Sequence, residues 1–179
     1  MTLKELLAKK KKAIVAGWMD SVIETYPEET AQFLRKKSDR MLNPVGAAIE
    51  TETERLFDLI LEGIDPEKAT KFLDNIIRIR AIQDFRPAQA LAFVFALKHV
   101  VRQVLGSDLA KGGHADELWD LDKEIDRLAL ISFEIYMAVR EQIYQLKAKE
   151  VHSNAFMLLR RSGLLVEQEG ASADEGESD

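Results

Sequence analysis

The sequence contains no cysteine. This absence excludes disulfide bonds, thiolate zinc sites, iron–sulfur clusters and cysteine nucleophiles, and it is typical of proteins in a reducing compartment. We therefore expect the protein to be cytoplasmic. Long apolar runs are missing as well: no stretch of eighteen apolar residues occurs, so we expect no stable membrane insertion. The N-terminus, MTLKELLAKKKKAIVAGW, lacks a continuous apolar stretch with a small-residue cleavage site, so we expect no signal peptide.

An excess of basic residues is also lacking. The formal net charge is −6, from 31 acidic and 25 basic residues. Six of the acids lie in EQEGASADEGESD, residues 167–179, so the rest of the chain holds 25 acids against 25 bases. A neutral body with an acidic tail argues against binding to nucleic acid, which needs an uncompensated basic face. We expect one helical domain over 1–161 and a disordered acidic tail over 162–179.

Proline is scarce, and each proline stands where a segment with helical periodicity begins. The four positions are Pro27, Pro44, Pro66 and Pro87. Proline suits the first helical position because its missing N–H needs no partner there. Asn43 and Asp65 precede two of the prolines and can cap the free amides with a side-chain oxygen. No segment alternates with a period of two, so the sequence predicts an all-α fold.

The apolar spacing predicts six helices. Their expected ranges are 2–25, 28–40, 44–62, 66–82, 87–105 and about 115–160. The last is unusual because neither glycine nor proline occurs between Gly113 and Gly163. A continuous helix there would be roughly 68 Å long, more than the width of a compact domain of this size. The alternative is a break near Lys147, after which the chain folds back.

The long C-terminal helix carries two apolar stripes. One stripe can pack on the domain's own core, and the other then needs a partner, so we predict a homodimer through this helix. We assign the interface to the first stripe, whose spacing of three and four resembles a heptad repeat: Leu118, Leu121, Ile125, Leu128, Ile135, Val139 and Leu146. The second stripe, on another face, consists of Leu130, Phe133, Met137 and Tyr144.

Two longer runs carry a family resemblance. They are FLRKKSDRMLNPVGAAIETETERLFDLILEG and LDNIIRIRAIQDFRPAQALAFVFALKHVVRQVL. The most specific pieces are residues 43–46 (NPVG), residues 76–85 (IIRIRAIQDF) and the apolar helix that begins at Pro87. Over about residues 5–150 the chain resembles the N-terminal sensory domain of the RsbR/RsbRD-type co-antagonists of the bacterial stressosome.

The resemblance implies a globin-like helical fold that forms a dimer and generally carries no haem. It implies a non-catalytic sensory or adaptor domain that acts by protein–protein contact in stress-response signalling. In full-length relatives this domain precedes a STAS domain, whereas only SGLLVEQEGASADEGESD follows Arg161 here. We therefore expect the signal to pass through the dimer or to an unidentified protein partner.

A single histidine, His99, follows the apolar run of residues 90–97 and raises the alternative of a haem-binding gas or redox sensor. On a helical wheel it shares a small, polar face with Gln89, Ala92, Ala96 and Gln103. A proximal haem ligand needs an apolar slot lined by large side chains, so we expect a histidine at the solvent edge and no cofactor.

No metal site or catalytic motif is recognisable in the sequence. His99, His114 and His152 share no metal-ligand spacing, so we expect no bound metal. Glycine-rich phosphate loops, nucleophile elbows and zincin motifs are missing, so we do not expect an enzyme.

A possible buried polar cluster lies at the end of the fourth predicted helix. Arg78 and Arg80 alternate with isoleucines, so one of them is expected to be partly buried and to need a partner. Asp84, just before Pro87, can cap the next helix or accept from one of these guanidinium groups. Two interpretations stay open: an ion pair that fixes the turn, or a site for an anion or signalling ligand.

The basic run from Lys9 to Lys12 interrupts the first predicted helix. A membrane-surface helix pairs a basic face with Leu and Trp, which fits Leu7 and Trp18. We favour a solvated face on a core-packed helix, because Ile14 and Trp18 have a core to join.

Overall fold

The computed structural model describes residues 1–35, 41–110 and 112–163. These residues form six helices and no strand: α1 (Leu3–Ile23), α2 (Glu28–Arg35), α3 (Pro44–Glu62), α4 (Pro66–Ile82), α5 (Pro87–Leu109) and α6 (Ala115–Arg161). The predicted all-α fold with a long C-terminal helix is confirmed. From position 164 the predicted acidic tail lies outside the described residues, as does the predicted helix from 36 to 40.

The chain divides into two units, Met1–Glu141 and Gln142–Asp179. α6 has 47 residues and belongs to both units. It is helical throughout, so the chain does not break near Lys147.

Local signals explain where the helices begin. Pro44, Pro66 and Pro87 occupy first helical positions, as predicted. The side chain of Asn43 accepts from the amide of Gly46 at 2.9 Å, and Asp65 caps α4 in the same way. Pro27 directly precedes α2, which begins at residue 28 as predicted, and its carbonyl accepts from the amide of Ala31 at 2.8 Å.

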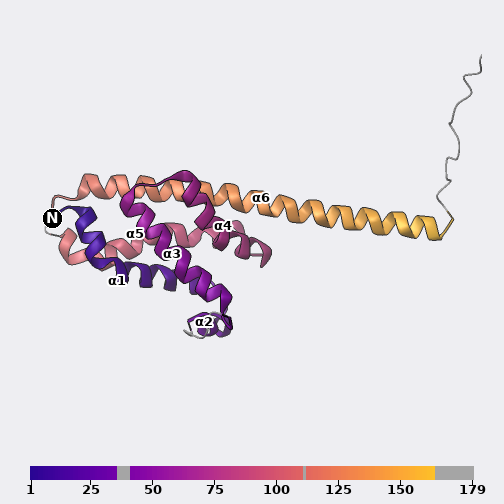
Figure 1. Ribbon diagram of the computed structural model, residues 1–179, viewed down its shortest axis with the longest axis horizontal. Coiled ribbons are helices and arrows are strands. Elements are labelled where there is room, and N and C mark those ends of the chain that lie inside the picture. The colour runs from indigo at the N-terminus through magenta and orange to yellow at the C-terminus, as the bar shows by residue number, and fades with distance from the viewer. Residues whose placement is uncertain (36–40, 111, 164–179) are drawn as a thin grey trace, which may run out of the picture. The chain divides into compact units, whose positions relative to one another are not determined.

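The core of the first unit is built around the packing of α1 on α5 and α3 (Figure 1). Trp18 of α1 is fully buried, and its indole N–H donates to the carbonyl of Phe93 in α5 at 2.8 Å. The two rings stack with centroids 6.3 Å apart. At Gly17 an added Cβ would lie 3.0 Å from a methyl group of Val100, so a glycine there lets the two helices approach closely.

α1 packs as a core helix. Ile14 and Trp18 are buried, while Lys11 forms ion pairs with Glu54 and Asp58 of α3. This arrangement favours the core-packed interpretation of the basic run over a membrane-surface helix.

Among the described helices, α5 alone has the length and hydropathy of a membrane span. The apolar residues of α5 form part of the protein core, because eight of its side chains are buried in the first unit. They are Ala90, Leu91, Phe93, Val94, Leu97, Val100, Val101 and Leu105.

Candidate functional site

The first stripe of α6 belongs mostly to the core of the first unit. Ile125, Leu128, Ile135 and Val139 are buried within a single chain. These four side chains of the predicted dimer interface pack in the first unit's own core, so little of their surface is left for a second copy to cover. Of the remaining three, Leu118 and Leu121 are half-buried and Leu146 is exposed.

The second stripe is the exposed one. In the first unit, Leu130, Phe133 and Met137 of α6 lie at the surface. Leu130 and Phe133 lie beside Phe95 of α5, which is also exposed. A cavity of about 450 Å³ lies between the two helices and is lined mainly by apolar side chains, including Leu91, Phe95 and Leu130. Nothing in the sequence indicated this cavity, because it depends on how α5 and α6 pack.

In the second unit, the described part of α6 is exposed along nearly its whole length. Tyr144, Val151 and Leu158 follow one another at intervals of seven, and Ala148 and Ala155 come four residues after the first two. Residues seven apart share one face of a helix. The stripe predicted from the sequence stopped at Tyr144, although the same interval would have found Val151 and Leu158.

We call the five exposed residues at intervals of seven the heptad stripe: Leu130, Met137, Tyr144, Val151 and Leu158. Their side chains are 48–69 % exposed. An exposed apolar row of this kind is typical of a helix that packs against another protein.

The structure separates the three residues of the predicted polar cluster. Arg78 points to the surface and binds Asp74 with two hydrogen bonds of 2.8 and 3.0 Å. Asp84 accepts from Arg140 of α6 at 2.6 Å. Its acceptor role was expected, but the partner is 56 residues away, which no sequence signal indicates.

Arg80 is the buried member of the cluster, with 1 % of its surface exposed. Its guanidinium lies over the rings of Tyr26, Phe85 and Phe93, at 5.4, 4.5 and 5.6 Å from the ring centroids. Nη2 donates to the hydroxyl of Thr25 and to the carbonyl of Gln89, each at 2.7 Å.

The charge of Arg80 has no carboxylate partner in the described chain. Its Nε and Nη1 atoms are buried without a hydrogen-bond acceptor there. Burial lowers the pKa of Arg80, and the nearby Tyr26 acts in the opposite direction. Burial raises the pKa of the Tyr26 phenol. In the described chain, aromatic faces and the two hydrogen bonds of Nη2 stabilise this cation.

The turn between α4 and α5 connects the arginine to α6. The hydroxyl of Tyr136 donates to the carbonyl of Phe85 at 2.5 Å, and Arg140 donates to the carbonyl of Ala81 at 3.2 Å. Asp84 in this turn has a positive φ of 59°, which is rare for a residue other than glycine. Two hydrogen-bonding side chains of α6 therefore hold a turn whose conformation is strained.

His99 lies exposed on α5, as its polar face predicted. His114 binds Glu117 at 2.8 Å. The described residues contain no group of three or more side chains suited to holding a metal ion.

Comparison with known proteins places the chain in a family. A sequence model of the family described as "RsbT co-antagonist protein rsbRD N-terminal domain" matches residues 12–151. The chain belongs to this family. The rsbRD N-terminal match covers all of α3, α4 and α5, and it ends at Val151 within α6. A protein of Archaeoglobus fulgidus described as uncharacterized is 21 % identical over 153 residues, which is 83 % of this chain and 89 % of that protein. No solved structure matches the chain.

Proposed function

We propose that the protein is a non-catalytic, dimeric sensory or adaptor domain that acts by protein–protein contact in cytoplasmic stress-response signalling. Membership of the rsbRD N-terminal family supports this proposal, because the family description makes its members co-antagonists of RsbT. A regulator named for antagonism needs a surface for a macromolecular partner. An RsbT-type protein, or an intermediary that binds one, is the partner class that this name suggests.

The heptad stripe carries the proposal of a dimer. Five apolar side chains at intervals of seven are more than half-exposed on average, and their intervals match the repeat of two helices that pack side by side. The alanines at positions 148 and 155 leave room for a second helix to approach closely. Two copies related by a two-fold axis would cover the same stripe on each other.

The groove between α5 and α6 extends the same surface. Phe95, Leu130 and Phe133 line it and remain exposed in the single chain. Aromatic side chains of this kind dominate the energetics of many interfaces. A second copy that covers the stripe in the first unit would also cover this groove, which adds apolar area at the Leu130 end of the interface.

The turn between α4 and α5 offers a route from the core to this interface. Phe85 lies over Arg80 with its ring and accepts from Tyr136 with its carbonyl. Tyr136 and the exposed Met137 are adjacent in α6. A change in the packing around Arg80 would therefore shift Tyr136, which is next to a residue of the proposed interface.

Light scattering after size-exclusion chromatography tests the proposal directly. We expect a mass of twice the 20.3 kDa chain at high protein concentration, falling towards that of one chain on dilution. A mass of a single chain at every concentration would remove the dimer and with it the proposed mechanism.

A further inference from the structure

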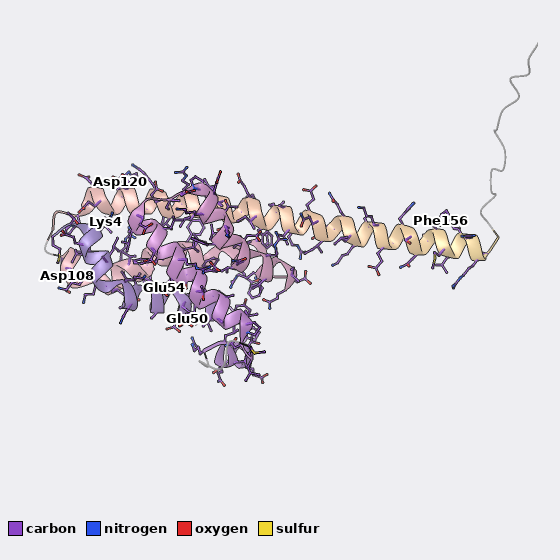
Figure 2. The ribbon with its side chains drawn as sticks, viewed as in Figure 1. Lys4, Glu50, Glu54, Asp108, Asp120 and Phe156 are labelled. Carbon is purple, nitrogen blue, oxygen red and sulfur yellow. The ribbon has the colours of Figure 1, made fainter. Side chains whose placement is uncertain are left out.

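A second cavity lies among the first turns of α1, the last turn of α3 and the first turns of α6. Its volume is about 370 Å³. This value falls within the range of small-molecule sites, about 300 to 1,000 Å³. Five apolar side chains make up most of its lining: Leu3, Leu7, Ile60, Leu61 and Leu121. Figure 2 shows Lys4 and Asp120, two residues of its rim, near the ends of α1 and α6 that form it.

Most charged groups of the rim already have partners. Glu117 accepts from the amide of Leu3 at 3.1 Å and from His114 at 2.8 Å. Asp120 forms an ion pair with Lys123 at 3.1 Å. These contacts hold the rim together and leave little capacity for a ligand.

Two charged side chains of the rim remain, Lys4 and Glu124. Lys4 is exposed, so water solvates its ammonium and a partner would add little. Glu124 is half-buried, and its carboxylate has no hydrogen bond or ion pair within the described chain. A partly desolvated carboxylate gains more from a cation than an exposed one does.

We propose that this cavity binds a small amphipathic cation, with an apolar body against the leucines and an ammonium group on Glu124. The rim as a whole favours the same sign of charge, because three carboxylates face two lysines. The proposal goes beyond the proposed function and does not depend on dimerisation, since every lining residue belongs to the first unit of one chain.

Titration of the ¹⁵N-labelled full chain with hexylamine tests this site, with hexanol and hexanoate as neutral and anionic analogues. We expect hexylamine to cause saturable shifts of the backbone amides around Leu7, Leu61 and Leu121. Hexanol should bind more weakly and hexanoate most weakly. No saturable shift at these residues would overturn the site, and equal or tighter binding of hexanoate would overturn the assignment of a cation.

Two matched variants then test the anchor. Glu124→Gln keeps the shape of the side chain and should weaken hexylamine binding by about three- to ten-fold while leaving hexanol binding unchanged. Glu134→Gln makes the same change at an exposed position of α6 outside the cavity and should leave hexylamine binding unchanged. If the two variants bind hexylamine equally well, Glu124 is not the anchor and the proposal fails.

Discussion

Replacing Leu158 by glutamate separates the two stripes of α6 as candidates for the dimer interface. Leu158 belongs to the heptad stripe, and Leu146 continues the first stripe. Both side chains are 66 % exposed, so they form a matched pair in size and environment. Leu146 comes two residues after Tyr144, which places it about 200° around the helix from the heptad stripe.

The expected effect follows from the exposed surface that a second copy would cover. Burying a whole leucine side chain contributes about 1.5–3 kcal/mol, so burying the exposed two-thirds of Leu158 contributes about 1–2 kcal/mol. A symmetric dimer contains the residue twice, which brings the loss in Leu158→Glu to about 2–4 kcal/mol. Such a loss raises the dissociation constant of the dimer by about 30- to 1,000-fold.

Sedimentation equilibrium of the wild type and both variants measures this dissociation constant, with far-UV circular dichroism to confirm that α6 stays helical. We expect Leu146→Glu to change the constant by less than about three-fold, as exposed substitutions usually do. A larger effect of Leu146→Glu than of Leu158→Glu would refute the reasoning and restore the first stripe as the interface.

Three further outcomes concern the core and the rim. Trp18→Phe should lower the free energy of unfolding by about 2–3 kcal/mol in urea titrations, because phenylalanine is smaller than tryptophan and loses the hydrogen bond to the Phe93 carbonyl. An unchanged midpoint of unfolding would contradict the role given to this contact. Arg80→Met should change the free energy of unfolding by less than about 2 kcal/mol, because methionine refills the aromatic cage and removes a buried charge that no carboxylate of the described chain compensates. Arg80→Ala should lower the free energy of unfolding by about 3–5 kcal/mol, because alanine leaves the cage empty. Equal losses in the two variants would contradict this account. Hydrogen bonds from His114 and from the Leu3 amide lower the pKa of Glu117 from its usual 4.5, so the stability that its carboxylate contributes is present above pH 4.5 and is lost as the pH falls through the lowered value. Glu117→Gln should therefore have a lower melting temperature than the wild type near neutral pH and the same melting temperature in acid. A difference in melting temperature that widens towards low pH would argue against the pairing of Glu117 with His114 and the Leu3 amide.

Local chemistry explains why the helices could be located from the sequence. Proline at a first helical position and an asparagine or aspartate before it act on neighbouring amides, so α3, α4 and α5 begin where predicted. The exposed position of His99 likewise follows from its place on one helical face. Pro27 likewise directly precedes α2, which begins at residue 28 as predicted.

Contacts between distant residues could not be predicted in the same way. The partner of Asp84 is Arg140, and the cage around Arg80 draws on the segment after α1, on the turn before α5 and on α5 itself. The isoleucines around Arg78 and Arg80 indicated that one arginine is buried, but nothing in the sequence indicated that aromatic rings would replace a carboxylate.

By itself, the sequence determined that this chain is helical, that its last helix is long and that this helix carries two apolar faces, because these properties depend on residues within a few turns of one another. Only the tertiary structure decided which face is used internally. Ile125, Leu128 and Val139 are buried because the packing of α6 on the first unit leaves them no solvent, and the same packing leaves Leu130 and Met137 exposed. Two stripes of similar composition are equivalent until the rest of the fold covers one of them.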